Sequence, residues 1–186
     1  MSGIDPRIAR GIRLVVLDVD GVLTDNGLYI GMAGGAPTEL KRFDVQDGLG
    51  LHLLRIAGIP VALLSGRFSE ATRLRAAELG IADVIQDPSA SKLPRLQALL
   101  DERGIRWDEV LYAGDDLADV PVLRRVGMPV TVANGVAEAR AVSAYVTERA
   151  GGAGAVREMV ETLLHARGEW DGTLAQYYRE RGGDST

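Results

Sequence analysis

Two acidic residues follow a short apolar run close to the N-terminus. The run is Leu14–Leu17, and Asp18 and Asp20 come directly after it, ahead of Gly21. In an extended turn, carboxylates two residues apart point the same way. One of them can attack phosphorus while the other protonates the leaving oxygen. The alternative is a simple turn with Asp18 as a helix cap, but the apolar strand before the pair and the continuation Val22–Asp25 favour the catalytic interpretation.

Other oxygen-bearing residues stand where further apolar runs end. Ser65 and Gly66 end one run, and Asp115 follows another. In open parallel sheets, ligands bind beyond the carboxyl ends of the strands, so these residues are expected to meet Asp18. Ser65 and Gly66 would offer a hydroxyl and backbone N–H groups to phosphate oxygens. Carboxylate oxygens without thiolates or clustered histidines suit Mg²⁺ rather than a softer metal.

Two more carboxylates follow Asp115 closely, and their interpretation stays open. Asp116 and Asp119 could support the metal site. Asp119 stands just ahead of Val120-Pro121, however, where an acidic residue commonly caps a helix. Both functions are therefore kept for Asp119.

Lys92 is the most informative single residue of the chain. Of 21 basic residues, only Lys41 and Lys92 are lysines, which indicates that a compact point charge is needed there. Lys92 also lies in the first turn of a predicted helix, where the helix dipole disfavours a cation. A phosphoryl group or the Asp18 carboxylate would compensate for that cost. The alternative is a solvated surface lysine.

The elements that position these residues alternate between strands and helices, which predicts an α/β fold with a doubly wound parallel sheet covered by helices on both faces. The predicted strands are apolar throughout, as expected for buried parallel strands. They are Leu14–Leu17, Val61–Leu64, Asp83–Ile85, Val110–Ala113, Val130–Ala133 and Tyr145–Thr147.

The whole chain, residues 1–186, is expected to form one domain with three distinctive segments. Residues 27–43 are too short for a helical crossover and predict a β-hairpin. A lone hairpin is marginal in water, so a second subunit is its expected partner. Gly151–Gly154 is interpreted as a flexible joint, and residues 168–186 as a tail that is mobile unless docked.

Composition limits the possible functions. A net charge of −5 argues against an extended nucleic-acid surface, and the absence of cysteine excludes disulfides and thiolate sites. With only His52 and His165, a zinc site is not expected, and His52 is interpreted as a helix residue facing the core or the hairpin. The longest apolar runs are of strand length, so no membrane span is predicted and the cytoplasm is the expected location.

Taken in order, these motifs resemble those of the haloacid dehalogenase superfamily. The matching segments are Asp18–Asp25, Ser65–Arg67, Lys92 and Gly114–Asp119. Lys41–Gly48, Arg75 and Gly151–Glu158 further resemble a cap-less branch whose members hydrolyse acidic sugar phosphates. The similarity covers about residues 11–167.

The resemblance implies a function for each matching residue. Asp18 would be the nucleophile and Asp20 the general acid/base. Mg²⁺ would be bound by the Asp18 side chain, the Asp20 carbonyl and Asp115, while Ser65 and Lys92 would hold the transferring phosphoryl group. The implied substrate contacts are Asp20, Asp44, Val45, Gln46, Asp47, Gly48, His52, Arg67, Arg75 and Lys92, with possible support from Thr24, Gly66, Asp116 and Asp119. A homotetramer in which the hairpin supports a neighbour's site is implied as well.

Three positions depart from the branch pattern, namely Asp44, Gln46 and His52, where neutral or basic residues are frequent. These changes are expected to weaken the binding of a sugar-acid carboxylate. Arg67 favours an eight-carbon sugar acid over a nine-carbon, sialic-acid-like one, which is kept as an alternative substrate. A third possibility is a non-catalytic oligomerisation module of a nucleotidyltransferase system.

Overall fold

The computed structural model describes residues 3–183 and contains a six-stranded sheet in the order β5-β4-β1-β6-β7-β8. Every neighbouring pair in this sheet is parallel. The strands are β1 (Leu14–Leu17), β4 (Val61–Ser65), β5 (Asp83–Gln86), β6 (Val110–Ala113), β7 (Met128–Thr131) and β8 (Tyr145–Val146). The chain winds outward from β1 to β5 and then crosses back to β6, so the strand order reverses between β1 and β6. Ligands bind at such a reversal in open α/β sheets.

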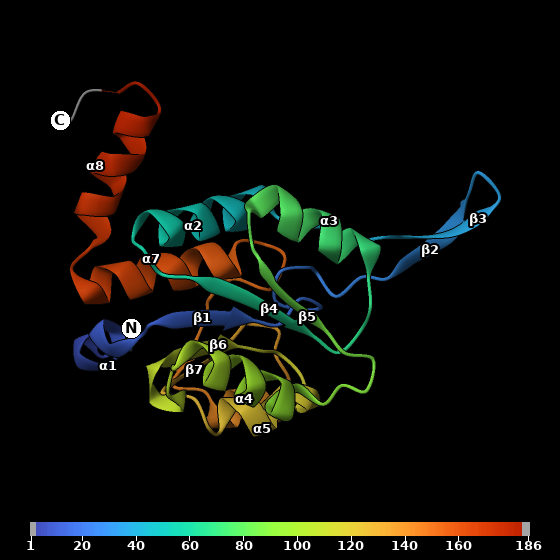
Figure 1. Cartoon of the computed structure of the whole chain (residues 1–186), viewed down its shortest axis with the longest axis horizontal. Helices are drawn as coiled ribbons and strands as arrows, with labels where there is room; N and C mark the ends of the chain where they lie inside the picture. Colours follow the sequence, from blue (N-terminus) through green and yellow to red (C-terminus); the bar gives the residue numbers. More distant parts are fainter. Residues whose placement is uncertain (1–2, 184–186) are drawn as a thin grey trace.

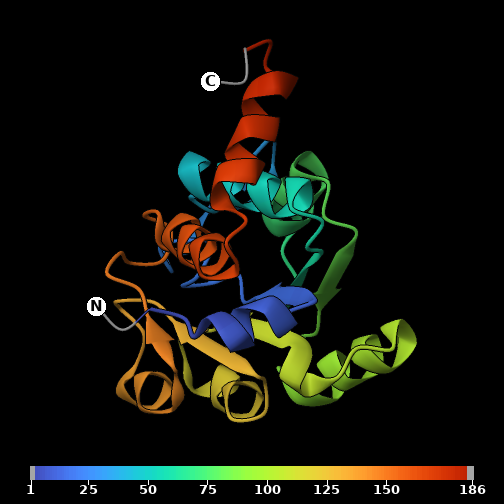
Figure 2. The same ribbon diagram turned by 90° about the vertical axis from the view of Figure 1, so that its left-hand side faces the viewer.

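Helices cover both faces of the sheet, which confirms the predicted doubly wound fold (Figures 1 and 2). They are α1 (Pro6–Gly11), α2 (Val45–Ile56), α3 (Glu70–Leu79), α4 (Lys92–Arg103), α5 (Val120–Leu123), α6 (Ala137–Val142), α7 (Ala155–Arg167) and α8 (Trp170–Glu180), with short 3₁₀ turns at Trp107–Glu109 and Leu117–Asp119. In the part of the chain described here, no helix combines the length and apolarity needed to cross a bilayer.

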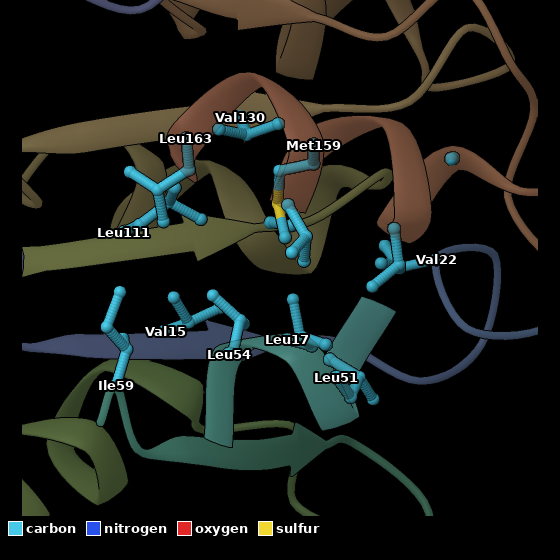
Figure 3. Close-up of a cluster of buried hydrophobic side chains, with 14 of the residues drawn as sticks. Val15, Leu17, Val22, Leu51, Leu54, Ile59, Leu111, Val130, Met159 and Leu163 are labelled. Carbon is cyan, nitrogen blue, oxygen red and sulfur yellow. The ribbon is translucent and has the colours of Figure 1, made fainter. Parts of the chain in front are cut away.

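The core divides at the central strand because successive side chains of a strand point to opposite faces. Val15 and Leu17 join the cluster under α2 and α7, where Leu54 and Met159 meet them (Figure 3). The other two residues of β1 join the second cluster, which packs against α4 and α5. All four residues of β1 are buried, which fixes the strand in the middle of the sheet.

The predicted hairpin is present as the antiparallel strands β2 (Tyr29–Ala33) and β3 (Ala36–Leu40). It projects from one end of the molecule, away from the helices (Figure 1). Large apolar side chains are exposed on it, with 74% of Ile30, 70% of Met32 and 64% of Leu40 accessible. Within this chain the hairpin therefore leaves apolar area in water that another surface would cover favourably.

Four of the six predicted strands differ in their bounds, and β4 and β5 each extend one residue further than predicted, to Ser65 and Gln86. Strand β7 covers Met128–Thr131 instead of Val130–Ala133, because Met128 is already in register with Leu111 and the chain turns after Thr131. Pro129 lies inside this strand, although proline is a poor signal for a central strand. The last strand ends at Val146.

Both segments predicted to be flexible are packed against the rest of the chain. The tail, expected to be mobile unless docked, is docked: residues 170–180 form α8, which packs on α2 and α7. Positions 184–186 lie outside the described residues. The glycines before α7 pack tightly on the loop after β1 and do not form a loose joint. A Cβ on Gly151 would lie 1.7 Å from the Gly21 carbonyl oxygen, and one on Gly152 would lie 2.2 Å from the Asp25 nitrogen.

Candidate active site

The carboxyl end of β1 places Asp18 beside Lys92, as the sequence predicts. Lys92 begins α4, and its Nζ lies 2.8 Å from Asp18 Oδ1 and 2.6 Å from Asp119 Oδ1. Its side chain is only 4% exposed, so the interpretation as a solvated surface lysine is wrong. Burial lowers the pKa of Lys92, but the carboxylates of Asp18 and Asp119 more than offset this and raise it overall. Lys92 is therefore a fixed cation at the predicted nucleophile.

Asp119 organises the surrounding loop. Its fully buried carboxylate accepts hydrogen bonds from the Lys92 ammonium, from the Tyr112 hydroxyl at 2.5 Å, and from the backbone N–H groups of Asp115 and Asp116 at 2.9 and 3.0 Å. Its side chain makes no capping bond to α5, so the simple helix-cap interpretation is wrong. A Cβ at Gly114 would lie 2.4 Å from the Asp119 carboxyl carbon, which explains the glycine at that position.

Three buried carboxylates converge at this point. One oxygen each from Asp18, Asp115 and Asp119 lies within 4.8 Å of the others. Burial, together with the Asp119 charge, raises the pKa of Asp18 to about 8 and that of Asp115 to about 7. The buried Asp115 Oδ1 has no hydrogen-bond partner within residues 3–183.

This cluster fits a divalent cation, because a cation would neutralise the concentrated negative charge and coordinate the unpartnered oxygen. Asp119 already accepts four hydrogen bonds, so Asp18 and Asp115 are the carboxylates with free capacity. Gly21 has a φ of +92°, and a Cβ there would lie 2.0 Å from Asp115 Oδ2. A side chain at position 21 would therefore displace the Asp115 carboxylate, the predicted metal ligand.

Asp20 does not join the carboxylate cluster. Its Oδ1 lies 2.6 Å from the Nζ of Lys41, whose side chain is fully buried, and Glu39 Oε1 lies 3.7 Å from the same Nζ. The metal contact predicted for Asp20 is through its backbone carbonyl, and its side chain is the predicted acid/base. Lys41 follows β3, so the hairpin reaches the predicted acid/base directly.

Glu39 links the hairpin to a second part of the site. Its carboxylate accepts hydrogen bonds from Arg67 Nη2 at 3.0 Å and from Ser69 Oγ at 2.6 Å. Sequence reasoning missed Glu39, just as it missed Tyr112, because nothing in the local pattern marks either residue. Their partners lie 28, 30 and 7 positions away in the chain.

The loops that shape the site are held by short-range hydrogen bonds. Thr24, fully buried, donates to the Val19 carbonyl and accepts from the Gly21 N–H, both at 3.3 Å. Ser65 is buried at the end of β4, and its Oγ accepts the Arg67 N–H at 3.2 Å. A Cβ on Gly66 would lie 4.0 Å from Lys92 Cε, so the Ser65–Gly66 turn faces the lysine. The carboxylate of Asp116, in contrast, accepts the N–H of its neighbour Leu117 at 2.7 Å.

The start of α2 carries most of the predicted substrate contacts. Asp44 is the N-cap, with Oδ1 accepting the Gln46 N–H at 2.7 Å, and Val45 is 81% exposed. Arg75 donates to the Asp44 carbonyl at 3.3 Å, and a Cβ on Gly48 would lie 2.5 Å from the Arg75 guanidinium. The structure thus brings residues 44–48 and Arg75 together.

Two of the predicted substrate contacts are turned elsewhere within this chain. Asp47 is buried, and its Oδ1 accepts the Arg157 N–H at 2.8 Å, so it caps α7 from a distant position. Burial raises the pKa of Asp47 to about 6. His52 faces α8, where Nε2 lies 3.8 Å from Glu180 and the ring meets Tyr177 edge-on. Burial and then Arg55 lower the pKa of His52.

The fold and the carboxylate site define a class of protein. A model of the haloacid dehalogenase-like hydrolases matches residues 54–159. The 3-deoxy-D-manno-octulosonate 8-phosphate phosphatases of Salmonella typhi and Escherichia coli K12 are each 42% identical over 168 residues, which is 90% of this chain and 87% of those proteins. The chain belongs to the haloacid dehalogenase-like hydrolase family.

Solved structures agree with this assignment. The phosphatase of Moraxella catarrhalis, determined with a magnesium ion, a phosphate ion and a KDO molecule, has a TM-score of 0.87 and 41% identity, covering 92% of this chain and 97% of that one. The cobalt-bound phosphatase of Haemophilus influenzae has a TM-score of 0.81 and 36% identity, covering 88% and 94%.

Proposed function

We propose that this chain is a Mg²⁺-dependent phosphomonoesterase that converts 3-deoxy-D-manno-octulosonate 8-phosphate to the free sugar acid and phosphate. The observation that carries the proposal is the buried Asp18 carboxylate, held by Lys92 and flanked by Asp115. The similarity to phosphatases that are named for this substrate supports it over 90% of the chain. The reaction would belong to lipopolysaccharide biosynthesis in the cytoplasm.

The residues divide the reaction into two displacements. The Asp18 carboxylate attacks phosphorus, and the bond between phosphorus and the sugar oxygen breaks as Asp20 supplies a proton to that oxygen. An aspartyl-phosphate is left on Asp18. Asp20 then takes a proton from water, which attacks phosphorus and releases phosphate, so Asp18 and Asp20 return to their starting states.

The remaining polar groups balance the charge of the phosphoryl group. Lys92 offers its ammonium to the phosphoryl oxygens, and Ser65 with the N–H of Gly66 offers hydrogen bonds. Mg²⁺ would be held by the Asp18 side chain, the Asp20 carbonyl and Asp115, with Asp119 and Asp116 as support, and when bound it supplies positive charge to the phosphoryl oxygens. Arg67, Arg75 and the start of α2 would recognise the sugar.

A panel of phosphate esters tests the substrate. We expect kcat/KM for 3-deoxy-D-manno-octulosonate 8-phosphate to exceed that for sialic-acid-like 9-phosphates and neutral sugar phosphates by at least about tenfold, since each charge-assisted contact contributes about 1.5–3 kcal/mol. A higher kcat/KM for the nine-carbon ester would show that the enzyme carries out the same reaction on a sialic-acid-like substrate instead. No turnover of any ester, including p-nitrophenyl phosphate with Mg²⁺, would support the oligomerisation module instead.

We propose further that the active unit is a homotetramer with the hairpin at its interface. A fold without a cap has no second domain to exclude water from the site. The hairpin exposes Ile30, Met32 and Leu40, while its base holds Asp20 and Arg67 through Lys41 and Glu39. Burial of the apolar side chains by neighbouring subunits would stabilise the hairpin and hold its base in place.

Deletion of residues 32–36 is therefore expected to loosen the assembly and to raise KM together. Met32→Glu keeps the length of the hairpin but places a charge on its exposed apolar surface, so it should also loosen the assembly and raise KM. Leu74→Glu on α3 is the matched control, because that leucine is also exposed, at 56%. Light scattering reports the mass. A mass of one 19.9 kDa chain in a fully active sample would disprove the tetramer but not the phosphatase chemistry.

A further inference from the structure

An arginine beside the proposed substrate site has no acidic partner. Arg149 follows β8 and is exposed, and its Nη1 donates to Gln46 Oε1 at 3.0 Å. Among residues 3–183, no carboxylate lies within 4.0 Å of its guanidinium, whereas Arg67, Arg75 and Arg157 each have one. A charged group that lacks a counter-ion in this region is available for an anionic ligand.

The main chain of Arg149 is held firmly. Its N–H donates to Glu158 Oε2 at 2.9 Å, and its carbonyl accepts the Thr147 hydroxyl at 2.6 Å and the Ala133 N–H at 3.2 Å. Two residues later, Gly151 packs against the Gly21 carbonyl, beside Asp20. The guanidinium therefore extends from a backbone that is tied to the catalytic loop.

Gln46 completes a donor pair. It lies in the first turn of α2, a 12-residue helix whose N-terminus favours negative charge. Its Oε1 accepts from Arg149, so its amide nitrogen remains a donor, and within the described residues this nitrogen has no hydrogen-bond partner. The pair presents guanidinium and amide N–H groups side by side, which is the chemistry that binds a carboxylate.

We infer that Arg149, aligned by Gln46, binds the carboxylate of the sugar-acid substrate and thereby determines specificity. The inference rests on the proposed function, and it assigns the acid group of that substrate to named residues. The competing interpretation is that the Arg149–Gln46 bond only ties α2 to the segment before α7. That interpretation predicts equal effects on substrates with and without a carboxylate.

The test compares 3-deoxy-D-manno-octulosonate 8-phosphate with p-nitrophenyl phosphate, which has no carboxylate. Arg149→Gln should lower the ratio of the two kcat/KM values by about tenfold to a hundredfold, the effect expected from one lost charge-assisted hydrogen bond. The loss should appear mainly as a higher KM for the sugar acid. Arg149→Lys keeps the positive charge but lacks the planar guanidinium, so its ratio of kcat/KM values should lie between those of wild type and Arg149→Gln.

Arg124→Gln is the matched control, because Arg124 is exposed after α5 and has no ion-pair partner in the described part of the chain. A melting curve of each variant checks folding. If Arg149→Gln and the control had equal ratios of kcat/KM for the two substrates, the inference about Arg149 would be overturned and the proposed function would stand. This holds whether kcat/KM is retained for both substrates or falls equally for both. If the wild-type enzyme hydrolysed p-nitrophenyl phosphate but not the sugar-acid ester, both the proposed substrate and the inference about Arg149 would be overturned.

Discussion

Asp18→Asn is expected to lower kcat by at least about a thousandfold while the protein stays folded. An amide cannot form the covalent phosphoryl intermediate, and a nucleophile acts in the transition state rather than in substrate binding. Because asparagine has nearly the same shape and Lys92 keeps Asp119 as a partner, the buried site should tolerate the change. Steady-state kinetics with p-nitrophenyl phosphate and with the sugar-acid ester measure the loss.

The matched control is Asp108→Asn, which makes the same chemical change at an exposed aspartate paired with Arg106. It should retain wild-type kcat, and thermal melting should show both variants folded. If Asp18→Asn kept wild-type turnover in a folded sample, the covalent mechanism assigned to Asp18 would be wrong. If it unfolded, Asp18→Glu would serve instead, since it keeps the charge but displaces the attacking oxygen.

The central part of the fold could be predicted because its signal is local. Leu14–Leu17 and Val110–Ala113 are apolar throughout, and both are strands at the predicted positions. Predicted strand boundaries were wrong where hydrogen bonding to a neighbouring strand, rather than the local apolar pattern, sets the ends of a strand. Strand β7 is an example, because its register with β6 pairs Met128 with Leu111. The tail was expected to be mobile unless docked. Its docking as α8 could not be predicted, because the contacts with α2 and α7 that stabilise it form only in the folded chain.

The site shows the same division between local and distant information. Asp18 with Lys92 could be predicted because each residue is unusual in its own context: an acid at a strand end, and a lysine at a helix start. Glu39 and Tyr112 could not be predicted, since their importance comes from contacts made only after folding. Asp47 and His52 were assigned from the motif, but the packing of α2 turns them toward α7 and α8.

Removal of the metal is expected to abolish activity. After EDTA treatment and dialysis, Mg²⁺ should restore turnover better than Ca²⁺, because the larger ion accepts irregular, higher coordination and would position the reacting groups poorly. The structural reason lies in the three converging carboxylates and the unpartnered Asp115 Oδ1. Full activity in metal-free buffer would refute the site assigned to Asp18, Asp20 and Asp115.

Thermal melting gives a second measure of the same site that does not depend on turnover. A cation bound only to the folded state at a hundred times its Kd stabilises by about 2.7 kcal/mol, which corresponds to a rise in Tm of roughly 5–10 °C for a domain of this size. Asp115→Asn should lose most of that rise because it removes a ligand and a charge, whereas Asp108→Asn should keep it. An equal rise in Tm for Asp115→Asn and wild type would show that Mg²⁺ binds elsewhere, whatever the activity assay reports.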